Sequence, residues 1–202
     1  YPALKAMGEG HCKKIFYLTA KTITRTVAEK TAGDMGERGL RCKVLTLTAK
    51  DKVCFLDERD CDPEVCPYAR GYFDRIQGAL RQLFESTDTW DRETLLAIAK
   101  EQRVCPFEFS LEASVIADVV ICDYNYAFDP RVALKRFFTQ SEADDGYCFL
   151  IDEAHNLIDR AREMYSARLD KERVLSVRRL IKDKLPDIAK ALNSVNKALL
   201  DY

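Results

Sequence analysis

Two adjacent carboxylates, Asp152 and Glu153, come directly after five consecutive apolar residues, 147–151, in the sequence Y-C-F-L-I-D-E-A-H-N. An apolar run of this length predicts a strand that is buried on both faces of a parallel sheet. Open α/β sheets bind their ligands at the carboxyl ends of such strands. In a phosphoryl-transfer site the first acid holds Mg²⁺, commonly through water, and the second orients or deprotonates the attacking water. The pattern therefore points to nucleotide hydrolysis, although Asp152 could instead be a simple helix N-cap.

The tetrapeptide L-T-A-K occurs twice, at 18–21 and at 47–50. Each copy follows a predicted strand, so its threonine hydroxyl and lysine ammonium stand where they could bind phosphates. The alternative is that each threonine caps the next helix while the lysine is only solvated. The repetition favours the phosphate contact.

Four of the eight cysteines fall within an acidic stretch, 51–108, of net charge −5. They are Cys54, Cys61, Cys66 and Cys105. Proline follows both Cys66 and Cys105, which predicts that each lies at a helix N-terminus, where the helix dipole favours a thiolate. Four thiolates in such places could hold an anionic iron–sulfur cluster. A lobe this short would also need a metal to stay folded.

Zinc is the main alternative metal for these cysteines. Zinc sites usually draw cysteines as close pairs, and in this stretch only Cys61 and Cys66 are spaced closely enough, which favours iron–sulfur. A further alternative is that the four are unrelated core residues. The other four cysteines are interpreted as structural: Cys12, Cys42, Cys122 and Cys148.

The elements that must position these residues alternate between strands and helices, which predicts an α/β fold with a parallel sheet. Strands are predicted at 14–19, 43–48, 117–122 and 147–151. Helices are predicted up to Gly8 and Gly10, from Thr22 or Thr24 to about 33, at 72–84, at 95–99 and from Asp129 to 138. From Leu157 onward the pattern indicates long helices, restarted by Pro186.

Charge is unevenly distributed along the chain: the net charge is +6 for 1–50, −5 for 51–108, −6 for 109–158 and +4 for 159–202. A bound polyanion should therefore meet the ends of the chain rather than its middle. No apolar run is long enough to span a membrane and no signal peptide opens the sequence, so we expect no membrane partner. Cysteines in such a chain favour a reducing compartment over a secreted disulfide scaffold. Because the first residue is Tyr1, we expect a piece of a longer protein.

Together these features resemble the superfamily 2 iron–sulfur DNA helicases of the XPD and DinG type. The resemblance is carried by Asp152-Glu153-Ala154-His155, the four-cysteine stretch upstream of it, Cys105-Pro106-Phe107-Glu108, and the segment Ala117-Asp118-Val119-Val120, Tyr124-Asn125-Tyr126 and Asp129-Pro130. It covers essentially the whole chain. The likeness looks bacterial, so we expect a cytoplasmic, nucleoid-associated protein.

The resemblance implies a RecA-like parallel sheet that belongs to a first motor domain, with a mostly helical iron–sulfur insertion and the start of a helical arch. The implied limits are 1–50 for the first part of the motor domain, 51–108 for the insertion, 109–158 for the continuation with the DEAH box, and 159–202 for the arch. Family members translocate 5′ to 3′ on single-stranded DNA and separate duplexes, so the expected partners are single-stranded DNA and DNA forks. The expected cofactors are ATP, Mg²⁺ and a structural 4Fe–4S cluster.

The resemblance also assigns roles to individual residues. Asp152 would hold Mg²⁺-ATP, Glu153 would be the catalytic base, and His155 would couple the nucleotide to a second motor domain. The segment that contacts single-stranded DNA would include Thr19, Lys21 and Thr22, with Tyr124 and Asn125 further along the chain. The cluster ligands would be Cys54, Cys61, Cys66 and Cys105.

One departure from the family is that no G-x-x-x-x-G-K-S/T phosphate loop occurs; Gly8-Glu9-Gly10-His11 is not one. We expect the loop, the rest of the arch and the second motor domain to lie in the remainder of the same protein, and the 202-residue chain alone to hydrolyse ATP negligibly. Another hypothesis is a non-catalytic zinc or iron–sulfur module that binds nucleic acid or protein. A hydrolase that uses His155 is weakly supported, because no H-E-x-x-H motif is present.

Overall fold

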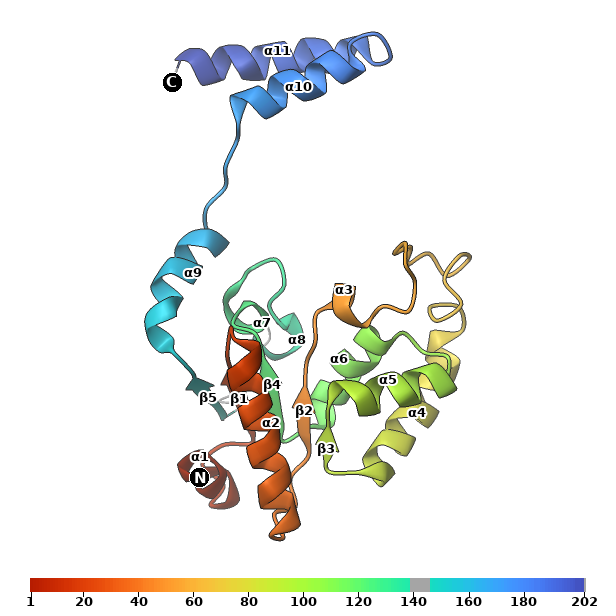
Figure 1. The fold of residues 1–202 in the computed structure, drawn as a ribbon, viewed down its shortest axis with the longest axis vertical. Coiled ribbons are helices and arrows are strands. Elements are labelled where there is room, and N and C mark those ends of the chain that lie inside the picture. Colours follow the sequence, from red (N-terminus) through yellow and green to blue (C-terminus); the bar gives the residue numbers. More distant parts are fainter. Residues whose placement is uncertain (139–145, 202) are drawn as a thin grey trace. The chain divides into compact units, whose positions relative to one another are not determined.

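The computed structural model describes residues 1–138 and 146–201, and its chain divides into two compact units, Tyr1–Ala161 and Arg162–Tyr202. The first unit is built on a five-stranded sheet in the order β3-β2-β4-β1-β5, with every described strand pair parallel (Figure 1). The strands are β1 (Lys14–Leu18), β2 (Val44–Thr46), β3 (Thr89–Trp90), β4 (Val119–Cys122) and β5 (Tyr147–Ile151). The predicted α/β fold with a parallel sheet is confirmed.

Four of the strands match the predicted ones, because each is an apolar run in which β-branched or aromatic residues are frequent. β1, β2 and β4 are almost entirely buried. The fifth strand, β3, is not foreseen by the sequence pattern, since two residues show no periodicity. It pairs with β2 through Val44–Thr89 and Leu45–Trp90, and the indole of Trp90 is fully buried.

β5 differs from its prediction. Within the described part of the chain it pairs only with β1, at an edge of the sheet, and Phe149 and Leu150 are 40% and 38% exposed. The expectation of a strand buried on both faces is therefore wrong. An apolar run indicates that a strand prefers burial, but it does not encode which neighbour is present on each side.

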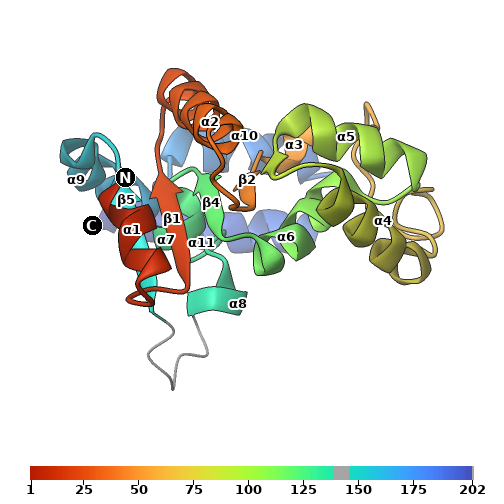
Figure 2. The same ribbon diagram turned by 90° about the horizontal axis from the view of Figure 1, so that it is seen from below.

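Helices cover both faces of the sheet (Figure 2). On one face, α1 (Pro2–Gly8) and α2 (Thr22–Glu37) pack against side chains such as Ile15. On the other, α8 (Lys135–Phe138) brings Phe137 and Phe138 to within 5.3 Å of the ring of Phe16. Successive residues of β1 thus face opposite layers, as strand geometry requires.

α2 is longer than predicted. It passes through Gly33 and Gly36 and ends at Glu37, with Arg38 as its C-cap, before Gly39 adopts a φ of +98°. An isolated glycine inside a helix costs only about 1 kcal/mol relative to alanine, so it does not by itself end the helix. The left-handed conformation at Gly39 is what redirects the chain toward β2.

The stretch 51–108 is mostly helical, as predicted. Its helices are α3 (Lys50–Val53), α4 (Tyr72–Ser86) and α5 (Arg92–Glu101), and α6 (Pro106–Ile116) follows. Cys105 is the N-cap of α6, which confirms the helix start predicted there. The helix predicted after Cys66 is wrong: the chain forms turns, in which the Cys66 carbonyl accepts from Ala69 and Arg70.

The helix predicted from Asp129 to 138 is also shorter than expected. α7 (Asn125–Phe128) ends before Asp129, and α8 begins only at Lys135. The buried Asp129 carboxylate accepts from the backbone and guanidinium of Arg131, at 2.9 to 3.1 Å, which holds the intervening residues in turns. Local aspartate-to-backbone bonds of this kind compete with a helix.

Lys14, the first residue of β1, joins the sheet to α6. Its side chain is only 8% exposed, and its ammonium donates to the carbonyls of Ser114 (3.0 Å), Val115 (3.3 Å) and Ala117. Burial lowers the pKa of this ammonium. The ammonium thus satisfies the carbonyls at the C-terminal end of α6, whose other end carries Cys105.

Replacing Lys14 by methionine is expected to lower the free energy of unfolding by about 2 kcal/mol, because several carbonyls lose their donor. Urea denaturation measures this change. The matched control is Lys13→Met, since Lys13 is the exposed neighbour and its loss should change little. Equal effects of the two substitutions would contradict the bridging role of Lys14.

The second unit is a helical hairpin. It contains α10 (Lys171–Ile181) and α11 (Pro186–Asp201), while α9 (Leu157–Met164) spans the division between the units. Pro186 begins α11 as the sequence predicts. None of the helices in the described ranges is long and apolar enough to cross a membrane.

Candidate nucleotide and nucleic-acid site

The two acids lie at the carboxyl end of β5, where its hydrogen-bonded pairing with β1 ends. The backbone N–H of Asp152 donates to the Leu18 carbonyl at 2.9 Å, which continues the parallel pairing by one residue. Glu153 then adopts a left-handed conformation, with φ 50° and ψ 45°, and the chain turns into η1 (Ala154–Asn156). Such a backbone is unusual for a residue other than glycine and is found preferentially at functional sites.

Asp152 is held from two sides. The Thr19 hydroxyl donates to its carboxylate at 3.3 Å, and the Tyr124 hydroxyl donates to its backbone carbonyl. Thr19 is only 4% exposed and Tyr124 is fully buried. The contacts join the ends of β1, β4 and β5, so the sheet itself fixes the position of this carboxylate.

Glu153 lies between two basic side chains. Its carboxylate oxygens are 3.4 Å from the Lys21 ammonium and 3.3 Å from Nε2 of His155. Residues that are separated by more than 100 positions in the sequence therefore meet at one edge of the sheet. The structure brings together six of the predicted site residues: Thr19, Lys21, Tyr124, Asp152, Glu153 and His155.

A recess of about 220 Å³ opens beside these residues, at the carboxyl ends of β1, β2 and β4. The predicted residues Thr19, Lys21, Thr22 and Asn125 line it. Sequence reasoning missed two further basic residues of its wall, Arg25 and Lys52. The signal that could have found Arg25 is its helical spacing from Lys21 and Thr22, which places the three on adjoining turns.

Tyr124 and the second L-T-A-K copy, residues 47–50, do not make the contacts that Thr19 and Lys21 of the first copy make. The ring of Tyr124 is fully buried, so its observed contact is with Asp152 rather than with the recess. Thr48 is buried as well, and its hydroxyl has no hydrogen-bond partner among the described residues. Lys50 instead contacts the acidic stretch 51–108, where its ammonium is 3.5 Å from the Glu108 carboxylate. The sequence repeat is therefore not a structural repeat.

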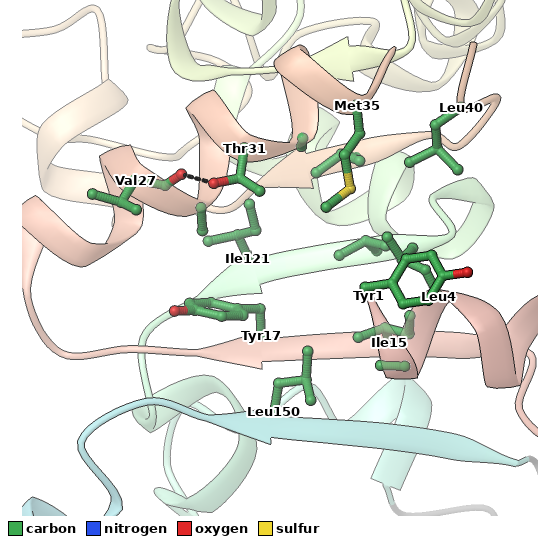
Figure 3. Close-up of a pocket in the computed structure, with 15 residues that line it drawn as sticks. Tyr1, Leu4, Ile15, Tyr17, Val27, Thr31, Met35, Leu40, Ile121 and Leu150 are labelled. Atoms are coloured by element: carbon green, nitrogen blue, oxygen red, sulfur yellow. Dashed lines mark hydrogen bonds between the residues drawn. The ribbon is translucent and has the colours of Figure 1, made fainter. Parts of the chain in front are cut away.

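A second recess lies on the face of the sheet beneath α1 and α2 (Figure 3). Its volume is also about 220 Å³, and its wall is mostly apolar; the hydroxyl-bearing residues are Tyr1, Tyr17 and Thr31, and the Thr31 hydroxyl donates to the Val27 carbonyl at 2.7 Å. Ile15, Tyr17 and Leu150 form its floor. Because most of this wall is aliphatic or aromatic, we do not assign phosphate chemistry to it.

The four cysteines of the acidic stretch do not gather at one point. No group of three or more His, Cys, Asp or Glu residues that could hold a metal occurs in residues 1–138 and 146–201. Cys61 is exposed, Cys66 is buried, and Cys54 and Cys105 are intermediate. Cysteine thiolates are suitable ligands for iron or zinc, but the four thiols do not surround a common metal position in this structure. The four-cysteine centre stays a prediction.

Lys50 nevertheless connects two of these cysteines. Its ammonium interacts electrostatically with the thiols of Cys61 and Cys105, and it stands 5.5 Å above the ring of Phe107. Desolvation alone would lower the pKa of this ammonium, but the two thiols and Glu108 raise it. Burial raises the pKa of Cys105, while the backbone N–H groups of Phe107 and Glu108 act in the opposite direction.

The chain is similar in sequence to known proteins. The chain is 36% identical over 88 residues to the Fanconi anemia group J protein homolog of Gallus gallus, a match over 44% of this chain and 7% of that protein. It is 34% identical over 94 residues to the ATP-dependent DNA helicase CHL1 of Saccharomyces cerevisiae (strain YJM789), over 46% and 10% of the two chains. The chain thus spans about a tenth or less of the length of these relatives.

Solved structures show the same fold. A structure described as truncated XPD matches 98% of this chain and 56% of its own, with a TM-score of 0.63 and 19% identity. A structure described as an XPD helicase matches 93% of this chain and 32% of its own, with a TM-score of 0.55 and 18% identity. The DEAD_2 family model matches residues 21–174, which is more than half of the sequence. The chain belongs to the DEAD_2 family.

Proposed function

We propose that this chain is part of an ATP-dependent DNA helicase that couples ATP hydrolysis to 5′-to-3′ translocation on single-stranded DNA and to duplex unwinding. The observation that carries the proposal is the meeting of Asp152 and Glu153 with Thr19 and Lys21 at the carboxyl edge of a parallel sheet. Membership in the DEAD_2 family and the helicase names of the relatives support it.

The roles of the site residues follow from their positions. Asp152 is the proposed ligand of Mg²⁺-ATP, and the hydroxyls of Thr19 and Tyr124 keep its carboxylate and backbone in place. Glu153 is the proposed base for the attacking water. His155, which contacts Glu153, is the proposed link to a second motor domain. The phosphate loop and the second motor domain are proposed to lie elsewhere in the same protein.

The recess at the ends of β1, β2 and β4 is the proposed track for the DNA backbone. Thr22 and Asn125 offer neutral hydrogen-bonding groups, while Lys21, Arg25 and Lys52 offer positive charge. Groups of these types bind phosphate oxygens without reading sequence. Tyr124 and Asn125 are the predicted DNA contacts from the end of β4. Because the ring of Tyr124 is fully buried and its hydroxyl bonds to the Asp152 carbonyl, we propose that Tyr124 positions Asp152 and that Asn125 makes the DNA contact.

Strand displacement by the full-length protein tests the helicase assignment. Duplexes with a 5′ single-stranded tail should be unwound with ATP and not with ADP, and duplexes with a 3′ tail should not be unwound. ATP-dependent unwinding from the 3′ tail alone would overturn the proposed direction. Tight DNA binding without any ATP-dependent displacement would favour a non-catalytic binding module.

We propose further that Cys54, Cys61, Cys66 and Cys105 hold a structural 4Fe–4S cluster in the full protein. The support is the donor type, the spacing, the position of Cys105 at the start of α6, and the approach of Cys61 and Cys105 to one ammonium. Because the thiols do not converge in this structure, no step of the proposed hydrolysis uses the cluster.

Lys50 gives a test of this cluster that does not depend on activity. Lys50→Met is expected to reduce the iron retained after anaerobic purification by several-fold, because the charge beside Cys61 and Cys105 is lost. Lys50→Arg should retain more iron than Lys50→Met. Lys100→Met, an exposed lysine on α5, is the control. Identical iron contents in Lys50→Met and the control would contradict this role.

The predicted domain limits are retained as part of the proposal, with the insertion at 51–108 between two parts of the motor domain and the arch from 159. The stretch 51–108 also supplies β3 to the sheet, where β3 pairs with β2. The continuation at 109–158 includes residues 139–145, which lie outside the described residues. The proposed cellular location is the cytoplasm, with the nucleoid.

A further inference from the structure

Cys12 and Cys148, which sequence analysis interprets only as structural, lie on neighbouring segments at the start of β1 and β5. Cys12 is two residues before β1, and Cys148 is the second residue of β5. The two strands are parallel, with Lys14 opposite Tyr147, and the pairing extends outward through a bond of 2.8 Å from the Lys13 N–H to the Gly146 carbonyl. The backbones are close here: a Cβ placed on Gly146 would be 3.5 Å from Cα of Cys12.

The side chains of the two cysteines belong to one apolar cluster. Cys12 is a buried member of the cluster that includes Ile15 and Val119, Cys148 packs against that cluster, and the thiol of Cys148 is near enough to raise the pKa of Cys12. A disulfide requires side chains that approach closely and face each other, so that the sulfur atoms can bond without movement of the backbone. Cys12 and Cys148 lie on adjacent backbone segments and share one cluster, and all eight cysteines are free thiols in this structure.

The two thiols differ in their access to solvent. Cys12 is only 8% exposed, and burial together with the neighbouring thiol raises its pKa. Cys148 is half-buried on the edge strand. A reagent from solvent would therefore reach Cys148 first, and Cys12 would be the second thiol to react.

We propose that Cys12 and Cys148 form a reversible thiol–disulfide pair that exchanges with low-molecular-weight disulfides such as oxidised glutathione. The Cys148 thiolate attacks one sulfur of the reagent, which forms a mixed disulfide and releases one glutathione thiolate. The Cys12 thiolate then attacks the Cys148 sulfur of the mixed disulfide, so the internal S–S bond forms and a second glutathione leaves. The two cysteines lose two electrons to the reagent, and their two protons end on the two glutathione thiols.

The bond would tie the segment before β1 to the edge strand that carries Asp152 and Glu153. Because it would close a loop of more than 100 residues, it should restrict the unfolded chain strongly and raise the melting temperature. The inference concerns the stability of the β1–β5 edge and does not rest on the proposed helicase function.

The thiol of Cys42, which belongs to the same cluster, does not compete with Cys12 for the mixed disulfide on Cys148. Burial together with the carboxylate of Asp118 raises the pKa of this thiol to about 12. Cys42 thus remains protonated and weakly nucleophilic near neutral pH. Because it lies in the same cluster, Cys42→Ser is a matched control for the loss of one sulfur atom.

The test uses the 202-residue chain, equilibrated with mixtures of reduced and oxidised glutathione, alkylated and digested with trypsin. The expected product joins the tryptic peptide 6–13, which contains Cys12, to the peptide 137–160, which contains Cys148. It should disappear on reduction. The oxidised chain should melt several degrees above the reduced chain, a shift that Cys42→Ser should keep and Cys148→Ser should lose.

Absence of the peptide 6–13 to 137–160 link in oxidising buffer would overturn the proposal. A link from Cys12 to Cys42, or a link that forms only after the chain has melted, would overturn it as well. Cys12→Ser provides a second check: in this variant Cys148 should stop at the mixed disulfide with glutathione. An unmodified Cys148 in that variant would contradict its assigned role as the accessible thiol.

Discussion

Replacing Glu153 by glutamine in the full-length protein should lower ATP hydrolysis and unwinding by about 100- to 10,000-fold, while DNA binding persists. The amide keeps the shape of the side chain, but it cannot accept the proton of the attacking water. The contacts of the neighbouring Asp152 with Thr19 and Tyr124 do not involve Glu153, so the proposed Mg²⁺-ATP ligand should remain in place. ATPase rates with single-stranded DNA, together with displacement and binding assays, measure the three properties.

The matched control is Glu37→Gln, an exposed carboxylate at the end of α2. Its activity should equal that of the unchanged protein. Retained unwinding in Glu153→Gln would show that Glu153 is not the catalytic base. It would favour the alternative of a metal-containing binding module. Loss of DNA binding together with ATPase would instead indicate that Glu153 supports the fold of this edge, through its contacts with Lys21 and His155.

Replacing Cys105 by serine should abolish the proposed iron–sulfur centre and loosen the lobe at 51–108. Anaerobically purified protein should contain about four iron atoms per chain and absorb at about 400 nm. The Cys105→Ser variant should have lost nearly all of the iron and of this absorbance. Amide hydrogen exchange should rise in α3 and α4, because a lobe of this size lacks a core large enough to remain folded without metal.

Cys148→Ser is the control for Cys105→Ser, since it removes a half-buried thiol outside the lobe and should leave the iron content unchanged. Colourless protein with one zinc per chain would show that the four cysteines bind zinc rather than an iron–sulfur cluster. Protein without metal, together with unchanged hydrogen exchange in Cys105→Ser, would show that the four cysteines are ordinary side chains of the lobe.

Local patterns in the sequence were sufficient to predict several features. Apolar runs mark β1, β2, β4 and β5, and the acids stand at the end of the last one. Pro106 correctly indicates the start of α6. These features depend on residues that are adjacent or one helical turn apart, where periodicity and backbone preference decide the outcome.

Other local signals failed because a contact elsewhere in the fold outweighed them. Gly33 does not end α2, since the cost of one glycine is small compared with the packing of a whole helix. The carboxylate of Asp129 bonds to Arg131 and replaces the expected helix with turns. The apolar run of β5 indicates a preference for burial, but the strand lies at an edge of the described sheet.

The sequence by itself determined which chemical groups this protein has and which of them end a strand. Only the tertiary structure decided which groups meet: Thr19 with Asp152, Lys50 with Cys61, and Cys12 with Cys148. The physical reason is that the order of parallel strands is set by crossover connections and by packing between distant segments, which local periodicity does not encode. The neighbours of a side chain across the sheet therefore become known only when the whole sheet is assembled.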